Sequence, residues 1–537
     1  MTLWYATEDL TLGEREILEP YFTNLEGPVF ALTNLPEVVK GALFARYSRT
    51  PRSLRRLFLD EFAEDVGPGG RVTAMGVARA EKLYDRVFVE YGDDSVAQLG
   101  GVHLACEQAS QLLCKALEWG RLAAYLEQST RYMRFDDKPG GRWRATVPDE
   151  VGQAEPELAE RFERFLDLSF DSYGRMFEPM REHYLRRFPQ GHTDSDFVYR
   201  STIQAKTCDA LRDLLPAATR SNVGIYGTGQ AFEQLLLRLR AHPLQEIRGY
   251  ADLILTELRK VIPAFLKRVD VEERGVAWSR YLQETRERTE EVAAKYLSGA
   301  ESGRRDEVTL VDYDPLGEEK VVAAALYGVS DLPDDRLHSL AHSMSPAERE
   351  AVLTAYIGER GNRRHKPGRA FERTSYRFDV LCDYGAFRDL QRHRLLTIEW
   401  QRLTTEHGFE VSPDIEEAGL TADWQSVMDA SDETHNALRD AGLGDSAQYA
   451  VSMAYKIRFV MQMNAREAMH VCELRSSPQG HPVYRRVAQR MHRLVDEQAG
   501  HHAIAAAMRY VDHSDVDLER LEAERRAEAK RKAGDGS

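Results

Sequence analysis

Late in the chain the sequence reads Arg392-His393-Arg394-Leu395-Leu396-Thr397, and in its first half it reads Glu127-Gln128-Ser129-Thr130-Arg131-Tyr132. The first stretch sets cationic or switchable donors in a row, which can hold a pyrophosphate. The second stretch brings a hydroxyl and a guanidinium together, which suits a monophosphate. Each stretch taken alone is more typical of a solvated or salt-bridged surface. Their interpretation therefore depends on the rest of the chain.

A third polar stretch, Asn464-Ala465-Arg466, is followed by His470 and Arg475. On a helix, Asn464 and Arg475 would fall on one face about three turns apart. Arg466 and His470 are four residues apart and would be neighbours on another face. Polar groups in one line on a helix can read the edge of a pyrimidine ring, while an exposed polar stripe is the alternative.

The hydrophobic pattern predicts a mainly helical chain with few strands. Apolar residues recur at three- and four-residue steps across 112–124 and again across 453–472, which predicts an amphipathic helix in each segment. Tyr376, Phe378 and Val380 alternate with polar residues, which predicts a half-buried strand. Asp383 follows at a position where it could cap the next helix.

The composition describes a soluble globular protein of two domains. The chain has 537 residues, of which 42% are hydrophobic and 30% charged. A formal net charge of −15 disfavours a nucleic-acid-coating role. The five cysteines are odd in number and widely spaced, which fits a reducing cytoplasm. We expect neither a signal peptide nor a membrane span.

The domain boundary is expected near residue 300. The polar segment 283–305 contains Ser298-Gly299-Ala300-Glu301-Ser302-Gly303, which predicts a connecting helix and a flexible link. This divides the chain into a first domain at 1–295, a second domain at 306–515 and a charged tail at 516–537, a solvated helix that frays.

The two halves carry similar features in the same order, which is the pattern of an internal repeat. In each half one predicted helix ends in basic residues, and a later predicted helix contains a Leu-Arg pair. These pairs are Leu237-Arg238 and Leu474-Arg475.

Taken together, these stretches resemble the flavin-dependent thymidylate synthases, whose signature is R-H-R-x-x-S-x-x-x-x-S-x-R-Y. The second half resembles the opening of that signature, with Thr397 for serine, and has lost its close. The first half has lost the opening, where Trp119-Gly120-Arg121 stands, and retains the close in Glu127 to Tyr132. Arg369-Ala370-Phe371-Glu372 resembles the strand with a conserved glutamate that precedes the motif in the family.

The resemblance implies a predominantly helical α+β fold with two tandem domains, each of helices packed on a small antiparallel sheet. It also implies FAD as cofactor, with NADPH and methylenetetrahydrofolate as co-substrates, and the reductive methylation of dUMP to dTMP. The resemblance further implies that no protein nucleophile is used and that an arginine polarises the pyrimidine N3. Family members are tetramers, so we expect a homodimer of this double-length chain to mimic them, with half of the ancestral sites complete.

The family's site residues map onto both halves. The second half keeps the flavin-type residues and the first keeps the nucleotide-type residues, and the late arginines are the catalytic candidates. The catalytic candidates are Arg238 and Arg475; the cofactor-binding candidates are Glu372, Arg392, His393, Arg394, Asn464, Arg466 and His470; the substrate-binding candidates are Glu127, Gln128, Ser129, Thr130, Arg131, Arg212 and Arg238.

Other interpretations stay open. The split motif also suits a relative that binds nucleotide or flavin without turnover, a related flavin-dependent enzyme that modifies a pyrimidine at C5, or a plain helical interaction protein. No metal site is predicted, because adjacent His501 and His502 would point to different sides of a helix and no metal-ligand spacing occurs. Gly227-Thr228-Gly229 lacks the third glycine of a dinucleotide loop.

Overall fold

The computed structural model describes residues 8–47, 50–67, 71–72, 98–192, 194–300, 303, 305–518 and 520–534. The chain divides into two compact units. Unit 1 contains residues 1–107, 120–127 and 222–300, and unit 2 contains residues 108–119, 128–221 and 301–537. Each unit is described by itself.

The first unit combines a three-stranded sheet with helices. β5 lies between β3 and β4 in this sheet, and β4 pairs with it antiparallel from Ala124↔Tyr226 to Glu127↔Val223. The ends of β3 and β5, at 108–110 and 220–221, belong to unit 2. The elements of unit 1 are α1 (Leu12–Leu18), α2 (Glu37–Tyr47), α3 (Leu54–Phe62), β1 (Val66–Gly67), β2 (Arg71–Val72), β3 (Gly101–Ser110), β4 (Ala124–Glu127), β5 (Arg220–Thr228), α9 (Gly229–Arg240), α10 (Gln245–Leu258) and α11 (Ala277–Leu297).

The second unit contains a four-stranded antiparallel sheet of order β6-β7-β9-β8. Its elements are α5 (Gln111–Glu118), α6 (Asp149–Gly152), α7 (Pro156–Arg187), α8 (Asp196–Leu211), β6 (Val308–Tyr313), α12 (Gly317–Tyr327), α13 (Asp334–Ser343), α14 (Pro346–Ile357), β7 (Ser375–Asp383), α15 (Tyr384–Leu390), β8 (Thr397–Trp400), α16 (Pro413–Glu417), α17 (Thr421–Asp440), α18 (Gly444–Ala447), β9 (Lys456–Asn464), α19 (Ala465–Arg475), α20 (Pro482–Glu497), α21 (His502–Ala507) and α22 (Leu521–Gly534).

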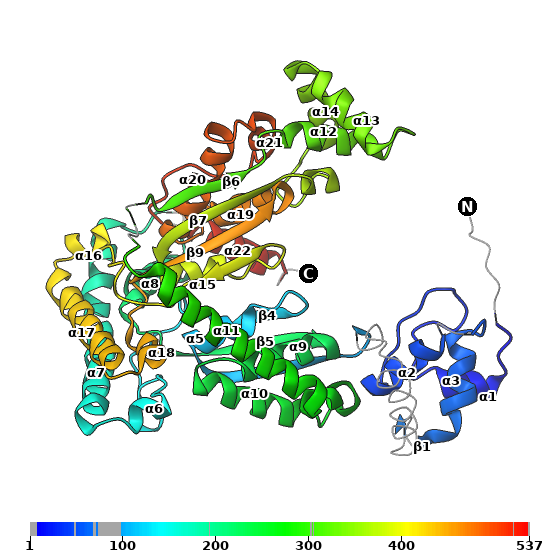
Figure 1. The fold of residues 1–537 in the computed structure, drawn as a ribbon, viewed down its shortest axis with the longest axis horizontal. Helices are drawn as coiled ribbons and strands as arrows, with labels where there is room; N and C mark the ends of the chain where they lie inside the picture. The colour runs from blue at the N-terminus through cyan, green and yellow to red at the C-terminus, as the bar shows by residue number, and fades with distance from the viewer. Residues whose placement is uncertain are drawn as a thin grey trace. The chain divides into compact units, whose positions relative to one another are not determined.

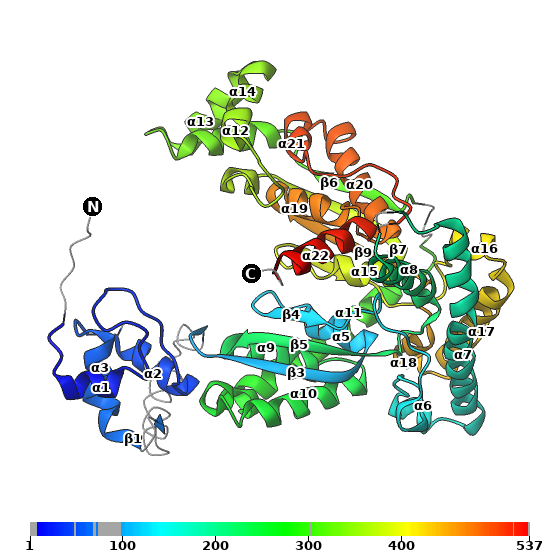
Figure 2. The same ribbon diagram turned by 180° about the vertical axis from the view of Figure 1, so that it is seen from behind.

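The core of unit 2 lies between this sheet and the helices packed on it. Alternate residues of β7 and β9 are buried, and the register sets Phe378 against Met461 and Val380 against Phe459. α19 and α20 pack on the strands and on each other, and α7 runs beside α17 (Figures 1 and 2). This alternation is the reason that β7 forms where the sequence predicts a strand, and Asp383 caps α15 through the Ala386 N–H as expected.

The two halves repeat one order of elements. The first half runs β3, α5, β4 and later β5, α9, α10, and the second runs β7, α15, β8 and later β9, α19, α20. In both sheets the later long strand lies in the middle, beside the earlier long strand on one side and the short strand on the other. The predicted fold class, tandem domains of helices on small antiparallel sheets, is therefore confirmed.

The compact units differ from the sequential halves 1–295 and 306–515. Residues 108–119 and 128–221 precede the expected boundary but belong to unit 2. Residues 301, 302 and 304 of the expected flexible link lie outside the described residues. The charged tail contains α22, which packs on α8 with Arg525 paired to Asp194 at 2.6 Å; residues 535–537 lie outside the described part.

Two local predictions from the hydrophobic pattern and one from the family resemblance are wrong. Segment 456–464 is strand β9 and not helix, because its buried residues alternate with a period of two. The helix expected across 112–124 ends at Glu118, and Ala124 begins β4. Residues Arg369–Glu372 form a 3₁₀ turn before β7 and not a strand.

In the part of the chain that the structure describes, no helix has the length and hydrophobicity needed to cross a membrane.

Candidate functional site

Arg131, one of the residues predicted to hold a monophosphate, lies on the segment that follows β4, and its guanidinium is buried. Its Nε donates to Asp209 Oδ1 at 2.6 Å and its Nη2 to Asp209 Oδ2 at 2.5 Å. Its Nη1 donates to the hydroxyl of Tyr484 at 3.1 Å. Burial raises the pKa of Asp209, but Arg131 and then Arg212 outweigh it, and the pKa lies below its usual range. Arg131 is therefore fixed from α8 on one side and from α20 on the other.

The centre of the arrangement is Asp389, in the last turn of α15. Arg392 and Arg475 approach Asp389 Oδ1 with their Nη1 atoms at 3.6 Å each, and Arg212 Nη1 lies 3.8 Å from Oδ2. Burial raises the pKa of Asp389, but Arg392, Arg475, Arg212 and Arg131 together hold it well below its usual range. One carboxylate thus collects guanidiniums from both halves of the sequence.

His393 connects this cluster to α19. Its Nε2 lies 2.9 Å from Arg475 Nε, which can only donate, so Nε2 accepts and the proton of the neutral ring is on Nδ1. Nδ1 faces Glu467 Oε1 at 3.4 Å. Burial and then Arg475 hold the pKa of His393 well below its usual value, so the ring is neutral at physiological pH. His393 therefore orients Arg475 and is itself oriented by Glu467.

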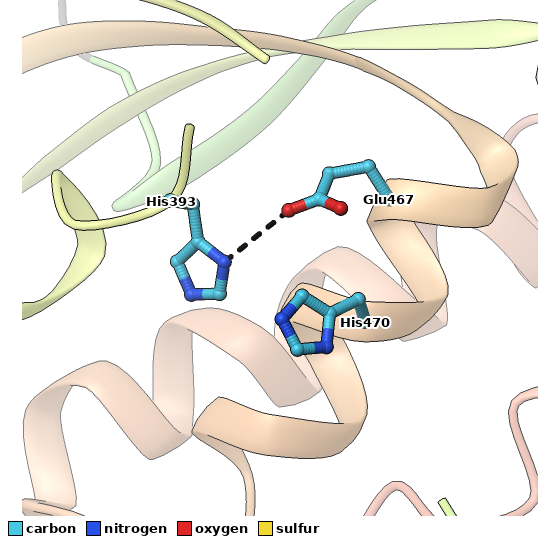
Figure 3. Close-up of side chains that lie close together, drawn as sticks. All are labelled: His393, Glu467 and His470. Atoms are coloured by element: carbon cyan, nitrogen blue, oxygen red, sulfur yellow. Dashed lines mark hydrogen bonds and ion pairs between the residues drawn. The ribbon is translucent and has the colours of Figure 1, made fainter. Parts of the chain in front are cut away.

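His470 completes a group with His393 and Glu467, and Figure 3 shows these side chains converging from α19 and from the segment after α15. Ligand atoms of all three lie within 4.8 Å of one another, and these are the residue types that bind metals. A metal on His393 Nδ1 would require a proton on Nε2, which would then meet the Nε–H of Arg475. The hydrogen bonding of His393 therefore favours a polar, metal-free role for this group.

The remaining flavin-type residues lie on and beside α19. Arg466 Nε donates to the Pro367 carbonyl at 2.9 Å, and its Nη1 lies 3.7 Å from Glu372 Oε1. Asn464 caps α19, because its side-chain oxygen accepts from the Glu467 N–H at 2.9 Å. The expectation that Asn464 and Arg475 share a helix face is wrong, because Asn464 precedes the helix. Arg394 is exposed.

The substrate-type residues near Arg131 have local partners, and two further candidates lie in unit 1. Ser129 Oγ accepts from the Arg131 N–H at 3.2 Å, Thr130 is buried, and Gln128 Nε2 lies 2.7 Å from Met133 Sδ. Glu127 ends β4 in unit 1, so the segment 127–131 does not continue as a strand. Arg238 of α9 also belongs to unit 1, where it lines a narrow space beside Tyr125.

Aromatic residues pack together at the positions where the first half has lost the opening of the family signature and the second half has an altered close. Trp119 stands at the lost opening of the first half, and its ring packs edge to face against Trp400 with centroids 5.7 Å apart. The Trp119 Nε1–H donates to the Ile398 carbonyl at 3.1 Å. The lost opening of the first half and the altered motif of the second half thus share an apolar contact.

A cavity of about 180 Å³ in unit 2 is lined by residues that include Asp213, Asp383, His481 and Trp424. Burial, and then the Asp383 carboxylate, raise the pKa of Asp213 to about 8. Burial likewise raises the pKa of Asp383 to about 6. Near neutral pH Asp213 is therefore protonated and neutralises little of the charge of Arg212.

This pair predicts a pH dependence of stability. Asp213 keeps its proton in the folded protein up to about pH 8, while an unfolded aspartate loses it near pH 4, so the folded state binds more protons between these values. The free energy of unfolding should therefore fall as pH rises through this window, and Asp213→Asn should flatten the fall. Urea unfolding at pH 5, 6.5 and 8 measures the slope, with exposed Asp331→Asn as control; equal slopes for wild type and Asp213→Asn would refute the assignment.

A comparison with protein families agrees with the repeated order of elements in the two halves. The model of the family described as thymidylate synthase complementing protein matches residues 45–264 and again 309–500. The chain belongs to the thymidylate synthase complementing protein family, in which the matched segment occurs twice. This confirms the resemblance to the flavin-dependent thymidylate synthases and the tandem duplication inferred from the sequence. Membership of the thymidylate synthase complementing protein family supports a flavin-dependent, nucleotide-modifying enzyme.

This chain is similar to other proteins over almost the whole length of both sequences. A UPF0159 protein of Chlamydia muridarum is 37% identical over 97% of this chain and 99% of its own length. The UPF0159 protein Ta1429 of Thermoplasma acidophilum is 30% identical over 91% of this chain and 99% of its own. A solved structure, a UMP/dUMP methylase PolB from Streptomyces cacaoi bound with 5-Br dUMP, aligns at 20% identity with a TM-score of 0.30, covering 39% of this chain and 99% of that chain.

The acidic partners of these arginines and histidines were not predicted from the sequence. Asp389 and Arg392 are three residues apart, as are Glu467 and His470, and this spacing on a helix signals neighbouring side chains. Asp209 had no such signal, because its partner Arg131 lies 78 residues away.

Proposed function

We propose that this protein is a flavin-dependent thymidylate synthase that reductively methylates dUMP to dTMP, with FAD as cofactor and methylenetetrahydrofolate and NADPH as co-substrates. The observation that carries the proposal is the convergence of Arg131, Arg212, Arg392 and Arg475 on Asp389 within one unit. Nucleotide-type residues of the first half and flavin-type residues of the second half thereby meet in one chain.

The charge of this cluster suits a nucleoside monophosphate. Arg131, Arg212, Arg392 and Arg475 all act on Asp389, and Asp389 and Asp209 are both held ionised among them. A phosphate monoester carries about −1.5 to −2 charges at neutral pH. These guanidiniums would donate charged hydrogen bonds to the oxygens of a nucleotide phosphate, with Ser129 beside Arg131 as a hydroxyl donor.

The surroundings of α19 fit a flavin. His393 and His470 are neutral, because burial lowers the pKa of His470 to about 4 and that of His393 well below its usual value. Neutral imidazoles beside Arg466 and Lys366 offer donors and an apolar edge to a ring system with an anionic tail. Bound flavin would relay the methylene group and supply the hydride.

Arg475 is the residue proposed to act on the pyrimidine. His393 accepts from its Nε and Asp389 faces its Nη1, so two partners fix the orientation of the guanidinium. Burial lowers the pKa of Arg475, an effect that the nearby Arg392 reinforces. A buried, preorganised cation of this kind stabilises negative charge that develops on a ring nitrogen or carbonyl oxygen.

The packing of Trp119 on Trp400 supports divided labour between the halves. The retained motif residues of both halves lie around Asp389. At the positions where the motif is lost or altered, Trp119 and Trp400 pack against each other. We propose one complete site per chain, and a homodimer that mimics the family tetramer.

Flavin and nucleotide titrations test this function. Purified protein should be yellow, and dUMP should perturb the flavin absorbance; Arg392→Ala should abolish flavin binding. Arg131→Gln, combined with Asp209→Asn so that no buried charge is left alone, should leave flavin bound and weaken dUMP by about 10- to 100-fold, as expected for lost charged hydrogen bonds.

Turnover separates this proposal from its alternatives. Rescue of a thymidine auxotroph by the wild-type gene would support thymidylate synthesis. A yellow protein that binds dUMP but fails to rescue would point to a binding relative or to another pyrimidine C5 modification. A colourless protein that cannot be loaded with flavin would refute the enzyme assignment, and equal loss of flavin and dUMP in the Arg131 variant would refute the split of roles.

A further inference from the structure

A strongly basic turn follows α14 and leads to the Arg369–Glu372 turn. Residues 359–369 read Glu-Arg-Gly-Asn-Arg-Arg-His-Lys-Pro-Gly-Arg. In the described part of the chain Arg363, Arg364 and Lys366 make no ion pair, whereas Arg369 pairs with Glu372 at 2.9 Å. Cations this close together in the chain repel one another, so the turn concentrates positive charge without a direct ion pair between these three residues and other described residues.

The turn is held in one conformation by its own side chains. Asn362 Oδ1 accepts from the Arg364 N–H at 2.9 Å, which closes an Asx turn. The ring of His365 accepts from the Gly361 N–H at 3.1 Å and contacts Asn362 Nδ2 at 3.1 Å. The cations at 363, 364 and 366 are therefore presented by an ordered backbone and not by a loose surface loop.

A buried guanidinium anchors the turn to the core. Arg360 is 1% exposed, and its Nη1 and Nη2 donate to Oε1 and Oε2 of Glu473 in α19 at 2.6 and 2.7 Å. Its Nε donates to the His365 carbonyl and its Nη2 to the Arg363 carbonyl at 3.4 Å. The ion pair thus ties the backbone of the basic turn to the helix that carries Arg466 and His470.

The turn acts electrostatically on the flavin-type residues. Lys366 affects the titration of Glu467, His393 and His470, and Arg363 affects that of His470. Burial lowers the pKa of Lys366; Glu467 and Glu473 oppose this fall, and the cations Arg466 and Arg363 add to it. An anionic group placed here would relieve this repulsion.

We propose that Arg363, Arg364 and Lys366 form a pyrophosphate-binding turn that grips the diphosphate of the dinucleotide flavin while α19 and His393 hold its ring. This assignment rests on the proposed function, and it adds residues that the family motif does not include. It also gives the site a preference for a dinucleotide over a mononucleotide flavin, because only the dinucleotide carries a diphosphate bridge for paired cations to neutralise.

Ligand binding to the full chain tests the turn without measuring turnover. The triple variant R363Q/R364Q/K366Q is compared with wild type by flavin fluorescence titration with FAD, FMN and riboflavin at several salt concentrations. The expected result is an FAD affinity weaker by about 100-fold with a shallower salt dependence, and riboflavin affinity within about twofold of wild type. The control R161Q/R164Q/R181Q removes exposed cations from α7 and should leave FAD binding unchanged.

Inorganic pyrophosphate separates failure of this inference from failure of the proposed function. If wild type binds no flavin, the enzyme proposal falls, but pyrophosphate should still raise the melting temperature of wild type more than that of the triple variant. If FAD binds both proteins equally, or if riboflavin weakens as much as FAD, the turn does not bind the diphosphate. A fall in NADPH affinity with FAD unaffected would also overturn the assignment.

Discussion

Asp389→Asn is expected to lower the free energy of unfolding by about 3–5 kcal/mol, the usual cost of leaving a buried charge without its partner. Arg212 is 2% exposed, and its carboxylate neighbours at 3.6 and 3.8 Å are Asp213 and Asp389. Asp213 is protonated near neutral pH, because burial raises its pKa to about 8. Asparagine keeps the shape of Asp389 and removes the charge that the guanidiniums share.

The same variant should respond to anions more strongly than wild type. Phosphate or dUMP would take the place of the lost carboxylate, and a ligand that binds only the folded state stabilises it more as its concentration exceeds its Kd. Chemical denaturation with and without phosphate measures both effects, and exposed Asp440→Asn serves as control. A variant within about 1 kcal/mol of wild type, with the same phosphate response, would contradict the role of Asp389 as counter-ion.

Arg360→Met should destabilise the protein by a similar amount, about 3–5 kcal/mol, because Glu473 would remain as a buried carboxylate without its cation. Both side chains are 2% exposed and joined by a bidentate ion pair. Glu473 Oε1 also accepts from the Tyr510 N–H at 3.4 Å. Loss of the ion pair should therefore loosen the C-terminal segment as well.

The double variant Arg360→Met/Glu473→Leu gives the sharper test. Replacing both members of a buried ion pair with apolar residues is often neutral or stabilising, so the double variant should recover most of the stability lost by the single one. Urea denaturation of the four proteins of this double-mutant cycle yields the coupling energy. Equal stability of the single and double variants would show that the pair contributes nothing as a pair. Recovered stability with weakened FAD binding would further support the anchoring of the basic turn.

The local hydrophobic pattern was sufficient to predict secondary structure where a single periodicity dominates. β7 and its cap Asp383 follow from Tyr376, Phe378 and Val380, and the capped α15 delivers Arg392 and His393. Segment 456–464 was misread because its apolar residues fit both periods, and pairing with β7 decided in favour of a strand. Local propensity does not contain that partner strand.

The sequence by itself determined the tandem family membership, the mainly helical α+β class and the residue types of the candidate site. Only the tertiary structure decided that Arg131 and Arg212 of the first half meet Arg392 and Arg475 of the second in one unit. It also decided that Asp389 is their common counter-ion and that His393 accepts from Arg475. The reason is physical: helical and strand periods act over a few residues, whereas charge pairing depends on distance in space, which the packing of distant segments sets.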